Sequence, residues 1–66
     1  MNNMTKEQIK AIKDAYDSNK KEIKRLRKEY ERANMEEDLD YEEGYNYALE
    51  FVMDTLGIKY TPLDEE

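Results

Sequence analysis

Residues 5–33 of the chain read TKEQIKAIKDAYDSNKKEIKRLRKEYERA. A seam with members spaced alternately three and four residues apart runs through them: Ile9, Ile12, Tyr16, Asn19, Ile23, Leu26, Tyr30 and Ala33. This spacing places all members on one side of an α-helix. At the start, the side chains of Thr5 and Gln8 are spaced to cap each other's backbone amides as a capping box. The sequence therefore predicts a helix over residues 6–33.

Three consecutive residues in the middle of this stretch favour helix N-caps: Asp17, Ser18 and Asn19. A break at 17–19 would let residues 6–16 fold back as the third helix of a bundle. The apolar seam nevertheless keeps its phase across this site, which a turn would not require. We therefore favour a continuous helix with Asn19 as a polar register residue, and the three-helix bundle is the alternative.

A second helix is predicted over residues 41–56. Asp40 is its expected N-cap, Glu43 completes a capping box, and Gly57 can adopt the left-handed conformation that ends many helices. Its apolar residues predict a stripe that packs against the first helix: Tyr41, Tyr45, Ala48, Leu49, Val52 and Leu56. The chain is thus predicted to be an all-α helical hairpin.

Domain organisation follows from these elements. Residues 1–58 form one expected helical domain, and residues 59–66 form an acidic tail that packs locally through Tyr60 and Leu63. The first helix, at about 42 Å, would be much longer than the second, at about 24 Å. Residues near its start would then lie in water, at about 1.5–3 kcal/mol for each large side chain. We therefore expect a homodimer that closes a bundle through Ile9, Ile12, Tyr16 and Asn19.

Composition excludes many kinds of chemistry. The 66 residues include neither Cys nor His, which removes thiolate and imidazole catalysis, Cys/His zinc clusters and disulfides. The carboxylates lack the ligand order of a calcium-binding EF-hand, and two short helices offer little concave volume for a catalytic pair. We therefore expect no enzyme activity, no cofactor and no metal.

Charge is split between the two halves of the chain. Residues 1–33 carry ten Lys/Arg and six Asp/Glu, whereas residues 34–66 carry one Lys and eleven Asp/Glu, which together give the net charge of −6. The run Lys20–Lys28 could contact phosphates, but the acidic net charge favours a solvated face, and we expect no nucleic-acid partner. No apolar stretch has the length of a membrane span or of a signal peptide core, so we expect a cytoplasmic protein without a membrane partner.

Two aromatic residues on the second helix fall outside the predicted core stripe. Tyr47 and Phe51 lie one turn apart, among the acidic residues Glu43, Glu50 and Asp54. Large rings bind well because they bring contact area at little entropic cost. These five residues are the predicted partner-binding face for a protein.

Residues 43–58, EGYNYALEFVMDTLGI, resemble the C-terminal helices of small orphan proteins encoded by phages and prophages of Gram-positive bacteria. The resemblance implies a non-enzymatic inhibitor or regulator of a host protein, with defence proteins among such targets, in the bacterial cytoplasm. Three other functions remain open from the residues: a DNA mimic that competes for a nucleic-acid-binding protein, a homo-oligomeric scaffold, and weak nucleic-acid binding through Lys20–Lys28.

Overall fold

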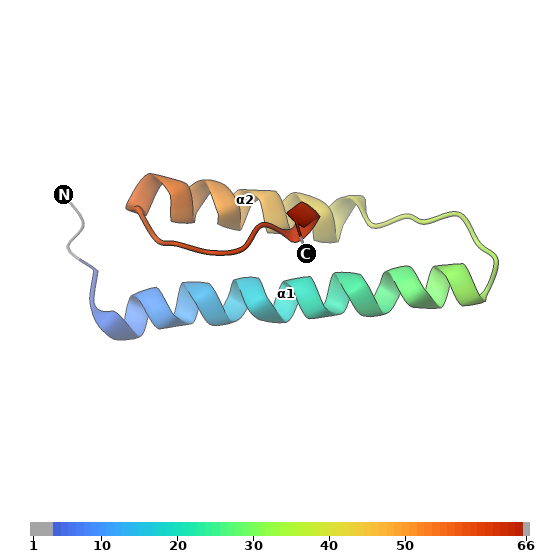
Figure 1. The fold of residues 1–66 in the computed structure, drawn as a ribbon, viewed down its shortest axis with the longest axis horizontal. Coiled ribbons are helices and arrows are strands. Elements are labelled where there is room, and N and C mark those ends of the chain that lie inside the picture. Colours follow the sequence, from blue (N-terminus) through green and yellow to red (C-terminus); the bar gives the residue numbers. More distant parts are fainter. Residues whose placement is uncertain (1–3, 66) are drawn as a thin grey trace.

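The computed structural model describes residues 4–65, which form two antiparallel α-helices and a short 3₁₀ helix (Figure 1). The elements are α1 (Lys6–Arg32), α2 (Asp40–Leu56) and η1 (Leu63–Glu65). The predicted all-α hairpin is confirmed. The first helix is continuous, so the alternative break at residues 17–19 does not occur.

Both ends of α1 are closed by local hydrogen bonds. Thr5 Oγ1 accepts from the Gln8 amide at 3.1 Å and Gln8 Oε1 accepts from the Thr5 amide at 2.9 Å, which confirms the predicted capping box. At the other end, Asn34 adopts the left-handed conformation with φ 57°, and the Met35 amide donates to the Tyr30 carbonyl at 2.9 Å. A residue of this type in this conformation ends a helix in the way that glycine often does.

The start of α2 differs from the prediction. Leu39, and not Asp40, is the N-cap, and no side chain caps the helix there. The reason is tertiary: Leu39 is buried against Ile23, and the Glu43 carboxylate is paired with Arg27. The predicted end is confirmed, because Gly57 has φ 73° and the following amide donates back to the Met53 carbonyl at 2.8 Å.

The loop between the helices sets their register. It runs back along α1, so that α2 lies beside the middle and the N-terminal half of α1 (Figure 1). Asn19 Nδ2 donates to the Glu42 carbonyl at 3.1 Å, and the Tyr16 hydroxyl donates to Glu50 at 2.7 Å. The expectation that the N-terminal part of the seam lies in water is therefore wrong: Tyr16 is 1% exposed, and Ile9 and Ile12 are half-buried.

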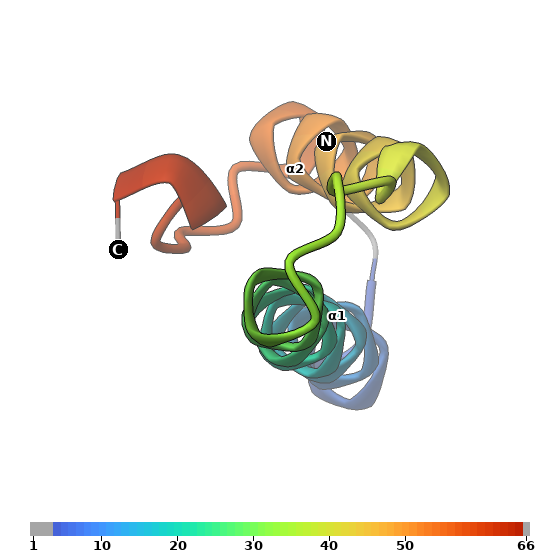
Figure 2. The same cartoon turned by 90° about the vertical axis from the view of Figure 1, so that its right-hand side faces the viewer.

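The C-terminal tail lies along one side of the two helices, as the end-on view shows (Figure 2). The Tyr60 ring meets the Tyr16 ring edge to face at 5.3 Å, and Leu63 is buried. The Thr61 carbonyl accepts from Lys20 Nζ at 2.9 Å, and it lies 3.1 Å from the Tyr16 hydroxyl, whose one proton it shares with the closer Glu50 carboxylate. The tail thus covers α1 at Tyr16, Lys20 and Ile23.

The core draws on every part of the fold. Ile23 of α1, Leu39 of the loop and Leu63 of η1 form one buried cluster. Tyr16 and Met53 are buried as well, from α1 and α2 respectively. Neither helix that the structure describes is long and apolar enough to cross a membrane.

Candidate functional site

The side of α2 that faces α1 and the tail is largely polar. We call it the inner face: Glu42, Glu43, Asn46, Leu49, Glu50, Met53 and Leu56, all of them buried or half-buried. Asn46 and Met53 at its centre are both fully buried. The predicted core stripe is therefore wrong in most of its members, and only Leu49 and Leu56 belong to this face.

Glu50 organises the polar contacts of the inner face. Its Oε2 accepts from the Tyr16 hydroxyl at 2.7 Å, from Asn46 Nδ2 at 3.0 Å and from the Leu63 amide at 3.4 Å. One carboxylate thus joins α1, α2 and the tail. Burial raises the pKa of the Tyr16 phenol, and the nearby Glu50 carboxylate raises it further.

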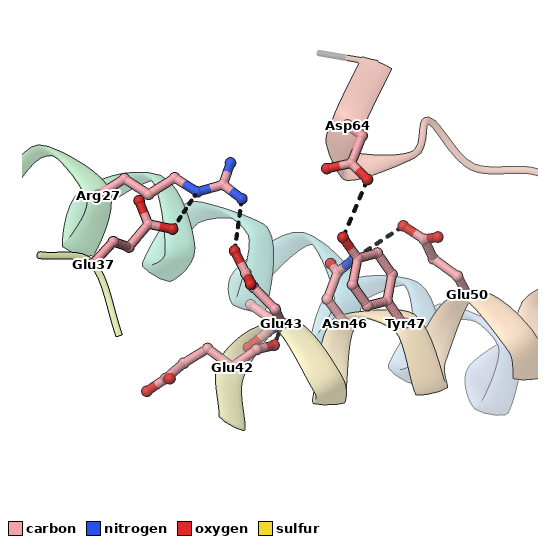
Figure 3. Close-up of polar contacts among 9 residues, drawn as sticks. Arg27, Glu37, Glu42, Glu43, Asn46, Tyr47, Glu50 and Asp64 are labelled. Atoms are coloured by element: carbon pink, nitrogen blue, oxygen red, sulfur yellow. Dashed lines mark hydrogen bonds and ion pairs between the residues drawn. The ribbon is translucent and has the colours of Figure 1, made fainter. Parts of the chain in front are cut away.

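Arg27 makes a second link between the two halves of the chain (Figure 3). Its Nη2 lies 2.9 Å from Glu43 Oε2 of α2, and its Nε lies 3.5 Å from Glu37 Oε1 of the loop. The hydrogen bond to Glu43 raises the pKa of Arg27, against a smaller lowering by desolvation. The basic first half and the acidic second half are therefore in direct contact here.

The predicted partner-binding residues lie in different surroundings: Glu43, Tyr47, Glu50, Phe51 and Asp54. Glu43 and Glu50 bind within the chain as described above. The Tyr47 hydroxyl donates to Asp64 Oδ2 at 3.1 Å (Figure 3), and Asp54 Oδ1 accepts from the Tyr60 hydroxyl at 2.8 Å. The latter bond raises the pKa of Tyr60 to about 12. Phe51 has 71% of its surface exposed to solvent.

The four predicted self-association residues also lie in different surroundings. Tyr16 is buried by the tail of its own chain, and Asn19 binds the backbone of α2. Ile9 and Ile12 are half-buried and keep some apolar surface in solvent. Dimerisation through them stays a prediction.

The side of α2 that points away from the core carries an uncharged and partly aromatic surface. We call it the outer face: Tyr41, Gly44, Tyr45, Ala48, Phe51, Val52 and Thr55, all of them exposed. Tyr41 is 86% exposed, Tyr45 47% and Val52 37%. Four of these residues belong to the predicted core stripe: Tyr41, Tyr45, Ala48 and Val52. Apolar residues occur on both sides of α2, and this pattern could have signalled a second surface to cover.

Gly44 lies in the middle of the outer face. A glycine inside a helix costs about 0.5–1 kcal/mol relative to alanine. A Cβ atom placed on Gly44 would meet no other atom within 4 Å, and Gly44 does not have a positive φ. No packing or backbone requirement within the described part of the chain therefore accounts for glycine here.

Charge beside the outer face is acidic. No Lys or Arg occurs between residues 34 and 58. Asp40 and Asp54 lie next to the outer face on the helix surface, and Tyr47 brings Asp64 to the same side. We call these three exposed carboxylates the acidic border. Within residues 4–65, no three acidic side chains are grouped so that they could hold a metal ion.

The predicted phosphate-contacting run on α1 is partly occupied by contacts within the chain. Lys20 is buried, with its Nζ bonded to the tail. Arg25 pairs with Glu22 at 2.7 Å and with Glu29 at 2.5 Å. These contacts reduce the number of cations that the run offers to solvent.

Comparison of the chain with protein-family models, with curated proteins and with solved structures gave no match.

Proposed function

We propose that this chain is a non-enzymatic protein-binding module that acts through the outer face of α2. The observation that carries the proposal is the exposure of Tyr41, Tyr45 and Phe51 on one uncharged helix face. A contiguous exposed apolar surface of this kind marks interaction sites in soluble proteins, and aromatic residues supply much of the energy of binding.

Only part of the predicted partner-binding face belongs to the proposed binding surface, which otherwise consists of other residues of the outer face. Phe51 remains a contact residue, whereas Glu43 and Glu50 already bind Arg27 and Tyr16 within the chain. Using them for a partner would require breaking those bonds. The uncharged residues of the outer face bind a partner without any such cost.

The kind of target is also part of the proposal. The resemblance of residues 43–58 to proteins of phages and prophages supports an inhibitor or regulator of a host protein. Binding over a few turns of one helix suits such a role, because the bound module only has to cover a working surface of its target.

Site-specific photo-crosslinking tests the proposed function. A benzophenone amino acid is placed at position 51 on the outer face, and in a matched control at Lys21, which is exposed on α1. In an extract of the cells that encode the protein, we expect a saturable adduct of defined mass from position 51 only. Excess native protein should compete for the adduct, and the double variant Tyr41→Ala, Phe51→Asp should not. Equal labelling from both positions would contradict the proposal.

A further inference from the structure

The outer face of α2 spans residues 41–55, which corresponds to about 21 Å or four helical turns. Its three aromatic side chains together expose on the order of 400 Å², given about 150–250 Å² for each ring. A standard protein interface takes about 800 Å² from each partner. The three rings therefore supply about half of that area from a stretch four turns long, which suits one docked helix.

The middle of the outer face favours the close approach of a helix. Gly44 and Ala48, one turn apart, present almost no side chain, while Tyr41 and Phe51 stand at either side. Two helices pack about 8–10 Å apart, and small residues at the contact permit the shorter distances. A partner helix placed over Gly44 would thus be held between aromatic rings.

The acidic border determines the charge of the partner. Asp40, Asp54 and Asp64 lie beside the outer face, and the single cation within residues 34–65 is Lys59 of the tail. A partner with acidic flanks would be repelled, and so would a second copy of α2 docked face to face. Lys or Arg on the flank of a partner helix would instead meet opposite charge.

The chain itself contains an example of this recognition. α1 is a basic amphipathic helix, and it packs on the inner face of α2 through the Tyr16–Glu50 hydrogen bond at 2.7 Å and the Arg27–Glu43 ion pair at 2.9 Å. Building on the proposed function, we propose that the outer face of α2 binds a basic amphipathic helix of a partner protein. α2 would then lie between two basic helices, one from its own chain and one from the partner.

The test uses a synthetic 18-residue amphipathic peptide of Leu and Lys as the probe and isothermal titration calorimetry as the measurement. One control peptide replaces Lys by Glu, and another replaces Leu by Gln, so that charge and apolar contact are separated. We expect binding of the Leu/Lys peptide at least about tenfold tighter than of either control. Equal affinity for the Leu/Glu peptide, or for the Lys/Gln peptide, would overturn the assignment of the partner.

Two variants locate the binding to the outer face. Gly44→Gln should raise the melting temperature, because glutamine is the better helix former, and should still weaken peptide binding about tenfold or more by blocking close approach. Phe51→Asp should also weaken it, whereas Lys13→Gln on α1 should not. Unchanged binding in both outer-face variants would overturn the proposal.

Sedimentation of the protein alone tests whether a second copy of the chain occupies the outer face. A dimer that Phe51→Asp converts to a monomer would show that a second copy occupies the face, and would overturn the partner assigned here. Failure of the peptide test together with a specific crosslink from position 51 would reject the basic helix and leave the proposed function standing. Absence of the crosslink would reject the proposed function itself.

Discussion

The inner and outer faces of α2 reverse the usual distribution of side chains in a helix. Asn46 and Glu50 are on the inner face and bond there, while Tyr41 and Phe51 are on the outer face and lie in solvent. Donors from α1 and the tail reach the Glu50 carboxylate, whereas Asn46 donates to Glu50 within α2 and its Oδ1 has no hydrogen-bond partner among the described residues. No contact within the described part of the chain accounts for the aromatic residues of the outer face, which is why we assign binding to it.

The largest expected contrast comes from neighbouring residues on opposite faces. Met53→Ala should lower the free energy of unfolding by about 2–5 kcal/mol, because it leaves a cavity in the core. Phe51→Ala should change it by no more than about 0.5 kcal/mol, since this ring is exposed. Denaturant unfolding followed by circular dichroism measures both. If Met53→Ala does not fold, Met53→Leu supplies the core variant. An equal loss at both positions would contradict the assignment of the faces.

The polar network of the inner face gives the next contrast. Glu50→Ala should cost about 1–3 kcal/mol, because the Tyr16 hydroxyl and the Asn46 amide lose their acceptor. Asp54→Ala, beside the outer face, should cost much less. Glu50→Gln keeps one acceptor oxygen and should fall between the two. Chemical unfolding ranks the three variants by their free energy of unfolding. If Glu50→Ala is as stable as the native chain, the polar network does not stabilise the fold.

Alkaline pH should reveal the contribution of the buried Tyr16 to stability. The raised pKa of Tyr16 leaves stability unchanged at pH values below about 10, its ordinary value, where the phenol is neutral in both states. At higher pH the unfolded chain releases this proton more readily, so stability should fall by up to about 1.4 kcal/mol per pH unit. Tyr16→Phe should reduce this fall relative to the native chain. Urea unfolding at about pH 9 and about pH 11 measures both slopes.

The smallest effect is expected at Gly44, and the other glycine of the chain, Gly57, gives its contrast. Gly44→Ala should stabilise the protein by about 0.5–1 kcal/mol, because the position is helical and has space for a methyl group. Gly57→Ala should destabilise it by about 1–2 kcal/mol, because the left-handed conformation at φ 73° strains alanine. Thermal unfolding of both variants gives the two signs. A loss of stability in Gly44→Ala would mean that this glycine serves the fold.

The sequence predicted the helices and most of their ends, because those depend on local patterns. The apolar seam of α1, the Thr5 capping box and the Gly57 cap each involve residues within one or two turns of one another. The start of α2 was displaced because Leu39 is held by Ile23, which lies 16 positions earlier in the chain. Tertiary packing decided that position.

The inner face of α2 could not be predicted from the sequence by the same means. Leu49 and Met53 form one possible apolar side of α2, while Tyr45 and Val52 contribute to another, so that periodicity alone allowed two orientations. The donors that settle the choice come from Tyr16 and from the tail. Four of the seven outer-face residues therefore belong to the predicted core stripe, and all three carboxylates of the predicted partner-binding face bind inside the chain.

Chemical modification of the tyrosines tests the orientation of α2 most directly. The purified protein at low micromolar concentration is treated with tetranitromethane, and nitration of each tyrosine is followed by peptide mapping and mass spectrometry. The structure predicts that Tyr41 reacts first, that Tyr45 and Tyr47 follow, and that Tyr16 reacts last, in the order of their exposure. Protection of Tyr41 and Tyr45 to the level of Tyr16, with sedimentation showing a monomer, would place these residues in the core and contradict the account.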